Sequence, residues 1–187
     1  MITALLDANV LYSAMLRDLF MRLAVGFVFQ PKWTERIQAE WVENVLENRP
    51  DVAREKIERT CKLMEQWGRD WQVPECESLI ATLFLPDTND RHVLAAAIAS
   101  QSPIIVTFNL SDFPETALAP YNIRALHPDD FLVELLDATT EVFVSAIQRH
   151  RLALKNPPQT PDEYLERFVE SGLRKTVSQL EAYRHRI

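Results

Sequence analysis

The chain has 187 residues, with 20 Lys and Arg against 27 Asp and Glu, so its formal net charge is −7 at pH 7. This acidity argues against binding a polyanion through bulk charge. Hydrophobic residues make up 47% and only three residues are glycine, which excludes the disordered and collagen-like classes. No apolar run approaches the roughly 18 residues needed to cross a bilayer, so we expect no membrane segment.

The N-terminal residues and the cysteines favour the cytoplasm. Residues 1–7 lack a basic region, a long apolar stretch and a small-residue cleavage site, so they do not form a secretory signal. Cys61 and Cys76 have neither metal-site spacing nor the numbers for a disulfide framework. At this length we expect one domain, with or without an appendage.

The first half of the chain predicts two strands and three helices. The apolar run Ile2 to Leu6 predicts a buried strand whose carboxyl end carries Asp7. Thr34 is a helix-capping residue, and the helix it begins carries Glu40. The other predicted elements are a helix over 9–25, a strand over 27–29 closed by Pro31, and a surface helix over 50–67.

The second half alternates helices and strands up to about residue 135. We expect a short helix over 75–84, a turn over 85–89 and a helix over 90–100 that is apolar almost all round. A strand over 104–106 follows, then a weaker strand over 123–126 and a helix from Pro128. Strands that alternate with helices of ten or more residues predict crossover connections, hence a three-layer α/β/α fold with a central parallel sheet.

The last fifty residues contain no strand signal, so we assign residues 1–135 to the α/β domain and 136–187 to a helical C-terminal extension. A helix is expected over 139–154, and its apolar residues Val142, Phe143, Ala146 and Ile147 are best explained by packing on the domain. Thr160-Pro161-Asp162-Glu163 combines an N-cap, a proline at the first helical position and a capping-box glutamate, and predicts a further helix start.

Several polar residues follow the predicted strands. In parallel sheets, ligands bind outside the carboxyl ends of the strands. Asp7 follows the first strand, and Thr107, Asn109 and Asp112 follow the strand over 104–106. A single acid at such a place is as well explained by helix capping, but the set together indicates a site.

Glu40 and Asp90 extend this set by helical geometry. At about 100° per residue, Glu40 borders the apolar face of its helix, where pairing with an arginine is an alternative to ligand binding. Asp90 faces the packed side of its helix, and it is free for another partner if Asp87 or Asn89 takes the cap. Carboxylates gathered at one edge repel each other, and oxygen ligands without a His or Cys cluster favour Mg²⁺ or Mn²⁺.

Four segments around these acids resemble the PIN-domain family, and within it the bacterial VapC-like toxin ribonucleases. The opening segment Leu5 to Leu11 is similar to the family's first strand and acid, and Glu40 fits the second acid. The more specific matches are Leu85 to Ala97, which carries Asp90, and Ile105 to Pro114. The resemblance covers about residues 1–135, and the helical tail is similar to an extension found in some family members.

The resemblance implies a metal-dependent endoribonuclease in which Mg²⁺ or Mn²⁺ is held by Asp7, Glu40 and Asp90. Thr107 would orient a ligand or a phosphate oxygen. Many members have Asp at the place of Asn109, so the fourth ligand is either Asn109 or Asp112. The family's partners would be an RNA substrate and a small antitoxin protein, and members commonly form homodimers.

Beside the proposed site, Arg91 and His92 are the candidate RNA-binding residues, although a single His is more often structural. Two other functions stay open. A catalytically degenerate PIN-like binding module is supported by Asn109 and by the net acidity. A haloacid-dehalogenase-like phosphotransferase ranks lower, because that chemistry needs a second acid where this chain has Asn9.

Overall fold

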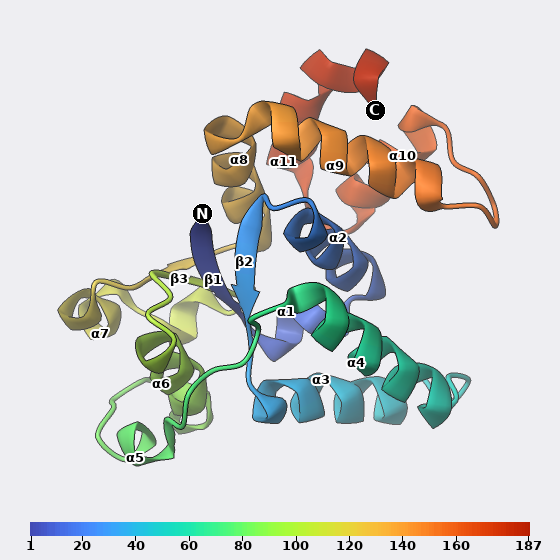
Figure 1. The fold of residues 1–187 in the computed structure, drawn as a ribbon. Coiled ribbons are helices and arrows are strands. Elements are labelled where there is room, and N and C mark those ends of the chain that lie inside the picture. Colours follow the sequence, from blue (N-terminus) through green and yellow to red (C-terminus); the bar gives the residue numbers. More distant parts are fainter.

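The computed structural model describes residues 1–187 and contains a four-stranded, all-parallel sheet in the order β2-β1-β3-β4. The strands are β1 (Ile2–Leu6), β2 (Phe29–Lys32), β3 (Ile104–Val106) and β4 (Arg124–Leu126). In Figure 1, α2 (Ala14–Val25) lies on one side of the sheet, and α6 (Arg91–Ala99) and α7 (Glu115–Leu118) lie on the other. The predicted three-layer α/β/α fold is confirmed.

The two central strands, β1 and β3, pair in register, with Leu5 opposite Ile105 and Leu6 opposite Val106. All four of these side chains are inaccessible to solvent, because helices cover both faces of the sheet. Parallel pairing brings the carboxyl ends of the strands to one edge. Asp7 and Thr107 are the first residues beyond β1 and β3, and they therefore meet at that edge.

The second strand lies two residues later than predicted. It was expected over 27–29 with Pro31 as its end, whereas β2 begins at Phe29 and runs through Pro31. Proline is tolerated there because β2 is an edge strand, where a missing amide need not break a ladder. Phe27 instead forms a left-handed turn with φ 61°, and its ring lies under the Arg69 guanidinium.

The helix predicted over 9–25 is two helices, α1 (Ala8–Tyr12) and α2, separated at Ser13. The Ser13 hydroxyl accepts a hydrogen bond from the Leu16 amide at 3.3 Å and so caps α2. Asp7 caps α1 in the same way, accepting from the Ala8 amide. The break turns α1 along the edge of the sheet.

The next three helices are α3 (Glu35–Asn48), α4 (Arg54–Gly68) and α5 (Glu77–Ile80). Thr34 caps α3 as predicted. The helix expected from Pro50 begins only at Arg54, and the helix expected over 75–84 is limited to four residues. Leu83 and Leu85 are buried on either side of an exposed Phe84, an alternation that requires extended chain after α5.

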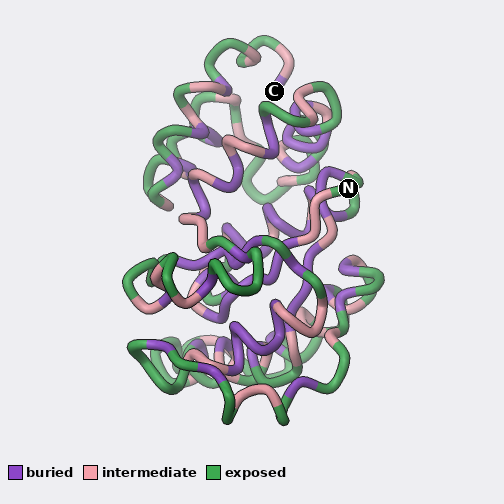
Figure 2. The backbone as a smooth tube through the Cα atoms, turned by 90° about the vertical axis from the view of Figure 1, so that its left-hand side faces the viewer, coloured by how far each residue is buried: buried purple, intermediate pink, exposed green.

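The C-terminal helices are α8 (Pro128–Ala138), α9 (Thr140–Ala153), α10 (Pro161–Glu170) and α11 (Arg174–Leu180). They lie together at one end of the molecule, opposite α3 and α4 (Figure 1). Buried backbone runs from the centre of the molecule into this end as well (Figure 2). The expected boundary at residue 135 falls inside α8, and the predicted capping box at Thr160 is confirmed.

Side chains of α8 and α9 join these helices to the sheet domain. Of the residues expected to pack, Phe143, Ala146 and Ile147 are buried, whereas Val142 is exposed because it lies on the outer face of α9. Phe131 of α8 packs on Phe20 and Phe29 with ring centroids 6.1 and 5.3 Å apart. The buried His150 of α9 lies 2.8 Å from the Asp18 carboxylate of α2 and 2.8 Å from the Tyr164 hydroxyl of α10. No helix is both long and apolar enough to span a membrane.

Candidate functional site

A cavity of about 400 Å³ lies at the carboxyl edge of the sheet, and its wall consists mainly of carboxylate and amide side chains. It brings together four of the residues that the sequence singled out, from four separate segments of the chain: Asp7, Glu40, Asp90 and Asn109. The other residues lining it are Ala8, Asn9, Tyr12, Asn44 and Asn48.

Asp7 is a buried carboxylate whose position is fixed by three hydrogen bonds. Its Oδ1 accepts from the Ala8 amide at 2.6 Å, and its Oδ2 accepts from Asn9 Nδ2 and Thr107 Oγ1, each at 2.7 Å. Burial raises the pKa of Asp7, against these hydrogen bonds, which lower it. A carboxylate has about four lone-pair positions, so one on Oδ1 stays available to a ligand.

Thr107 and Asn9 connect β1 to the loop after β3. The Thr107 hydroxyl donates to Asp7 and accepts from Asn9 Nδ2 at 2.9 Å and from the Asn109 amide at 3.1 Å. Asn9 Oδ1 accepts from the Phe108 amide at 3.1 Å. Sequence reasoning had not assigned Asn9 to the site. The available signal was its position two residues after Asp7, in the turn that leaves the strand.

Asp90 differs from Asp7 because its carboxylate has no hydrogen-bond partner. Asp87 accepts from the Asn89 amide and caps the 3-10 turn Thr88–Asp90, whereas Asp90 stands at the N-cap position of α6 and its side chain makes no capping hydrogen bond. Burial, followed by the charges of Asp7, Asp87 and Asp112, raises the pKa of Asp90 to about 6. Negative charge at this position is therefore poorly compensated by the protein.

Glu40 is held by two basic side chains. Its Oε1 lies 3.1 Å from Arg36 Nε, one helical turn earlier on α3, and 3.1 Å from His92 Nε2 of α6. Burial raises the pKa of Glu40, but His92 and Arg36 together outweigh it and leave the pKa below its ordinary value. The arginine pairing considered from the sequence is thus present, and the carboxylate still lines the cavity.

The remaining candidates lie around the cavity in different ways. Asn109 lines it and its side-chain amide has no hydrogen-bond partner in the chain. Asp112 ends a short 3-10 turn, Leu110–Asp112, outside the lining, although its charge acts on Asp90. Arg91 begins α6 directly after Asp90 and makes no ion pair.

Asn44 and Asn48 line the cavity but were not predicted from the sequence. Their spacing of four and eight residues from Glu40 places all three on one helix face.

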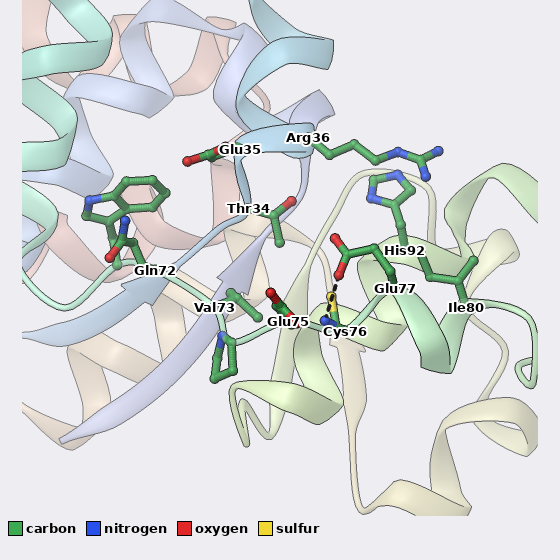
Figure 3. Close-up of a pocket in the computed structure, with 12 residues that line it drawn as sticks. Thr34, Glu35, Arg36, Gln72, Val73, Glu75, Cys76, Glu77, Ile80 and His92 are labelled. Carbon is green, nitrogen blue, oxygen red and sulfur yellow. Dashed lines mark hydrogen bonds between the residues drawn. The ribbon is translucent and has the colours of Figure 1, made fainter.

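A second cavity of about 250 Å³ is lined by His92, whose Nε2 lies 3.1 Å from the Glu40 carboxylate of the first cavity; Figure 3 shows this second cavity. It lies between the start of α3 and the segment 71–80, and it carries the carboxylates of Glu35, Glu75 and Glu77. Figure 3 shows the side chains of Arg36 and His92 near each other at its edge. Both partners of Glu40 therefore line this second cavity.

The first cavity has the ligand chemistry of a hard divalent cation. Its donors are carboxylate and amide oxygens, and Asp90 is unpaired. Burial, and then the neighbouring acids, raise the pKa of Asp90, and a bound cation would stabilise the charged form that they disfavour. The side chains do not form a ready cluster, since no three His, Cys, Asp or Glu residues stand in metal-binding proximity. The types of donor atom suit Mg²⁺ or Mn²⁺, but the side chains are too far apart to coordinate an ion together without moving.

Comparisons with known proteins give matches to two family models along the chain. Residues 3–111 match the family model of the PIN domain, and residues 128–182 match that of the VapC50 C-terminal domain. Over 81 residues the chain is 48% identical to the protein named "Putative ribonuclease VapC50" from Mycobacterium tuberculosis (strain ATCC 25618 / H37Rv). That match spans 43% of this chain and 48% of the relative, about half of the relative's length. No solved structure matches the chain.

Proposed function

We propose that this chain, which belongs to the PIN-domain family, is a metal-dependent endoribonuclease that acts as the toxin of a toxin–antitoxin pair. The observation that carries the proposal is the unpaired carboxylate of Asp90, whose pKa is raised to about 6 in a cavity that it shares with Asp7 and Glu40. Uncompensated acids at the edge of a parallel sheet are expected where a cation binds.

Asp7, Asp90 and Glu40 would hold Mg²⁺ or Mn²⁺, with Asn109 as a neutral oxygen donor. When bound, such an ion activates water and neutralises charge on a phosphodiester. Thr107 and Asn9 keep the Asp7 carboxylate in one orientation through their hydrogen bonds. His92 and Arg36 do the same for Glu40, so that two acids from different elements face one space.

Substrate binding would depend on local groups, since the chain as a whole is acidic. Arg91 follows Asp90 directly and has no carboxylate partner, which leaves its guanidinium free to bind a phosphate. His92 would then act by positioning Glu40 and not by contacting RNA, because it is buried and faces the carboxylate.

The toxin assignment also predicts a protein partner. The family resemblance and the relative's name support a small antitoxin, and the acidic cavity would attract a basic segment of it. Homodimerisation is part of the same proposal. Size-exclusion chromatography with light scattering, on the chain alone and after co-expression with the neighbouring open reading frame, distinguishes a monomer, a homodimer and a complex.

Cleavage of a structured RNA by the purified chain with Mn²⁺ tests the enzymatic part. We expect Asp7→Asn and Asp90→Asn to abolish cleavage while both variants stay folded by circular dichroism. Asp137→Asn is the matched control, because Asp137 is exposed on α8, at the far end of the molecule from α3 (Figure 1). Full cleavage by both site variants would refute the assignment.

A degenerate PIN-like binding module is the second candidate. It is favoured by Asn109 at the place of an acid and by the absence of a ready three-ligand cluster. A module of this kind would bind RNA without cutting it, and Mn²⁺ would not raise its thermal midpoint. Metal titration by thermal denaturation therefore separates the two functions without depending on the choice of RNA.

A further inference from the structure

Phe84 is the most exposed large hydrophobic side chain of the protein, with 81% of its surface open to solvent. The chain on either side is anchored, since Leu83 and Leu85 are only 2% and 8% exposed. The ring is therefore held outward by fixed backbone and does not lie in a loosely attached loop. A single exposed ring is common on protein surfaces, so the group that stands beside the ring decides what it could bind.

Arg91 is the nearest basic partner of this ring, with its guanidinium carbon 5.9 Å from the ring centroid. It makes no ion pair although the chain is acidic, and its Nε is buried without a hydrogen-bond partner. It also follows Asp90 directly in the chain. A guanidinium without an ion pair and an exposed aromatic ring thus stand together, and the guanidinium belongs to the residue next to Asp90, which lines the first cavity.

We propose that Phe84 and Arg91 form a nucleotide-binding element, in which the phenyl ring stacks on a base of single-stranded RNA and the guanidinium binds a neighbouring phosphate. The inference rests on the proposed ribonuclease function and identifies the form of substrate that the site accepts. Base stacking suits this chain because it adds affinity without overall positive charge. Tyr12, which lines the first cavity and is 39% exposed, offers a second ring for stacking.

The alternative ligand for the exposed Phe84 ring is a protein partner. The surroundings favour a nucleotide, because the exposed group is one ring between two buried leucines and not a continuous apolar patch. The adjacent charge is a guanidinium, the side chain that best matches phosphate geometry. Arg91 also directly follows Asp90, one of the acids proposed to hold the metal.

Binding of two fluorescein-labelled strands by fluorescence anisotropy tests the inference. One strand is an eight-residue oligoadenylate, and the other has the same backbone with all bases removed. All proteins carry Asp90→Asn, so that cleavage does not interfere. Phe84→Leu is compared with Phe84→Trp, which keeps the stacking surface. Phe27→Leu is the matched control. Phe27, on the turn after α2, is also exposed, and the guanidinium carbon of Arg69 lies 3.8 Å from its ring centroid.

We expect Phe84→Leu to weaken oligoadenylate binding by about five- to 150-fold and to leave abasic binding unchanged, whereas Phe84→Trp and Phe27→Leu bind as the parent does. Arg91→Gln should weaken both strands alike and lower the salt slope by about one. Equal loss on both strands for Phe84→Leu, or no loss on either, overturns the inference. The proposed function is tested separately, by cleavage of RNA with Mn²⁺ by the wild-type chain and its site variants.

Discussion

Asp90→Asn is expected to stabilise the metal-free protein at neutral pH. The folded-state pKa of Asp90, about 6, lies above its ordinary value of 3.8, so the folded protein binds this proton more tightly than the unfolded chain does. The free energy of unfolding therefore falls as the pH rises from about 4 to about 6, and the loss is complete at neutral pH. Asparagine does not titrate and removes this loss. No cap is lost, because the Asp90 side chain caps nothing.

The size of the effect follows from the pKa. Taken whole, a rise from 3.8 to about 6 corresponds to about 3 kcal/mol, at about 1.36 kcal/mol for each pH unit. Asp90 is only partly buried, and solvent screening reduces this to about 1 kcal/mol. For a chain of this length, about 1 kcal/mol raises the thermal midpoint by about 2–4 °C.

Urea denaturation in EDTA at several pH values between 4.5 and 7.5 measures the difference between wild type and Asp90→Asn. We expect about 1 kcal/mol in favour of the variant at pH 7.5, shrinking as the pH is lowered. Asp112→Asn should stabilise less, and the double variant should gain less than the sum, because these two charges repel each other. A variant that is no more stable than wild type at pH 7.5, or a difference independent of pH, would refute the electrostatic reasoning.

Three other substitutions test the site and the fold. Thr107→Val removes the hydroxyl that orients Asp7, and should lower the rate of RNA cleavage by about 10- to 100-fold, with Thr107→Ser restoring it. Gly68→Ala would place a methyl group 2.4 Å from the Trp33 ring, and chemical denaturation should show a loss of about 1–3 kcal/mol. His150→Ala leaves the Tyr164 hydroxyl without its partner and Asp18 with Arg22 alone, and should cost about 2–4 kcal/mol and speed proteolysis of the C-terminal helices. Burial raises the pKa of Asp18, but His150 and Arg22 lower it by more, so the folded-state pKa lies below its ordinary value. The stabilisation from the Asp18 charge is therefore present at neutral pH and is lost as the pH falls below 4.

The alternation of strands and helices was predictable, because a strand that is buried on both faces leaves a continuous apolar run in the sequence. The continuous apolar runs ending at Asp7 and Thr107 predict central parallel strands, and both were placed correctly. The second strand was misplaced because proline looks like a strand end locally. Whether Pro31 is tolerated depends on its strand being at the edge of the sheet, which only the assembled fold decides.

The site was predictable to different depths. The pairing of Arg36 with Glu40 follows from a spacing of four residues on one helix. The contact between Glu40 and His92 joins residues 52 positions apart and depends on how α3 and α6 pack. Asn9 was overlooked for a related reason. Its importance lies in bridging Asp7 to Thr107, which stand about a hundred positions apart and meet only through the pairing of β1 with β3.

The net charge of −7 acquires a more specific meaning from this geometry. Asp7, Glu40 and Asp90 line one cavity, where a divalent cation would offset their charge locally while the rest of the surface stays acidic. Two basic residues near this cavity, Arg36 and His92, already bind Glu40 and are therefore not available to a phosphate. Arg91 is the free cation beside the acids, so under the proposed function attraction for RNA would arise from a bound metal, from this one guanidinium and from base stacking. An acidic chain of this kind would select single-stranded RNA at one position without attracting nucleic acid over its whole surface.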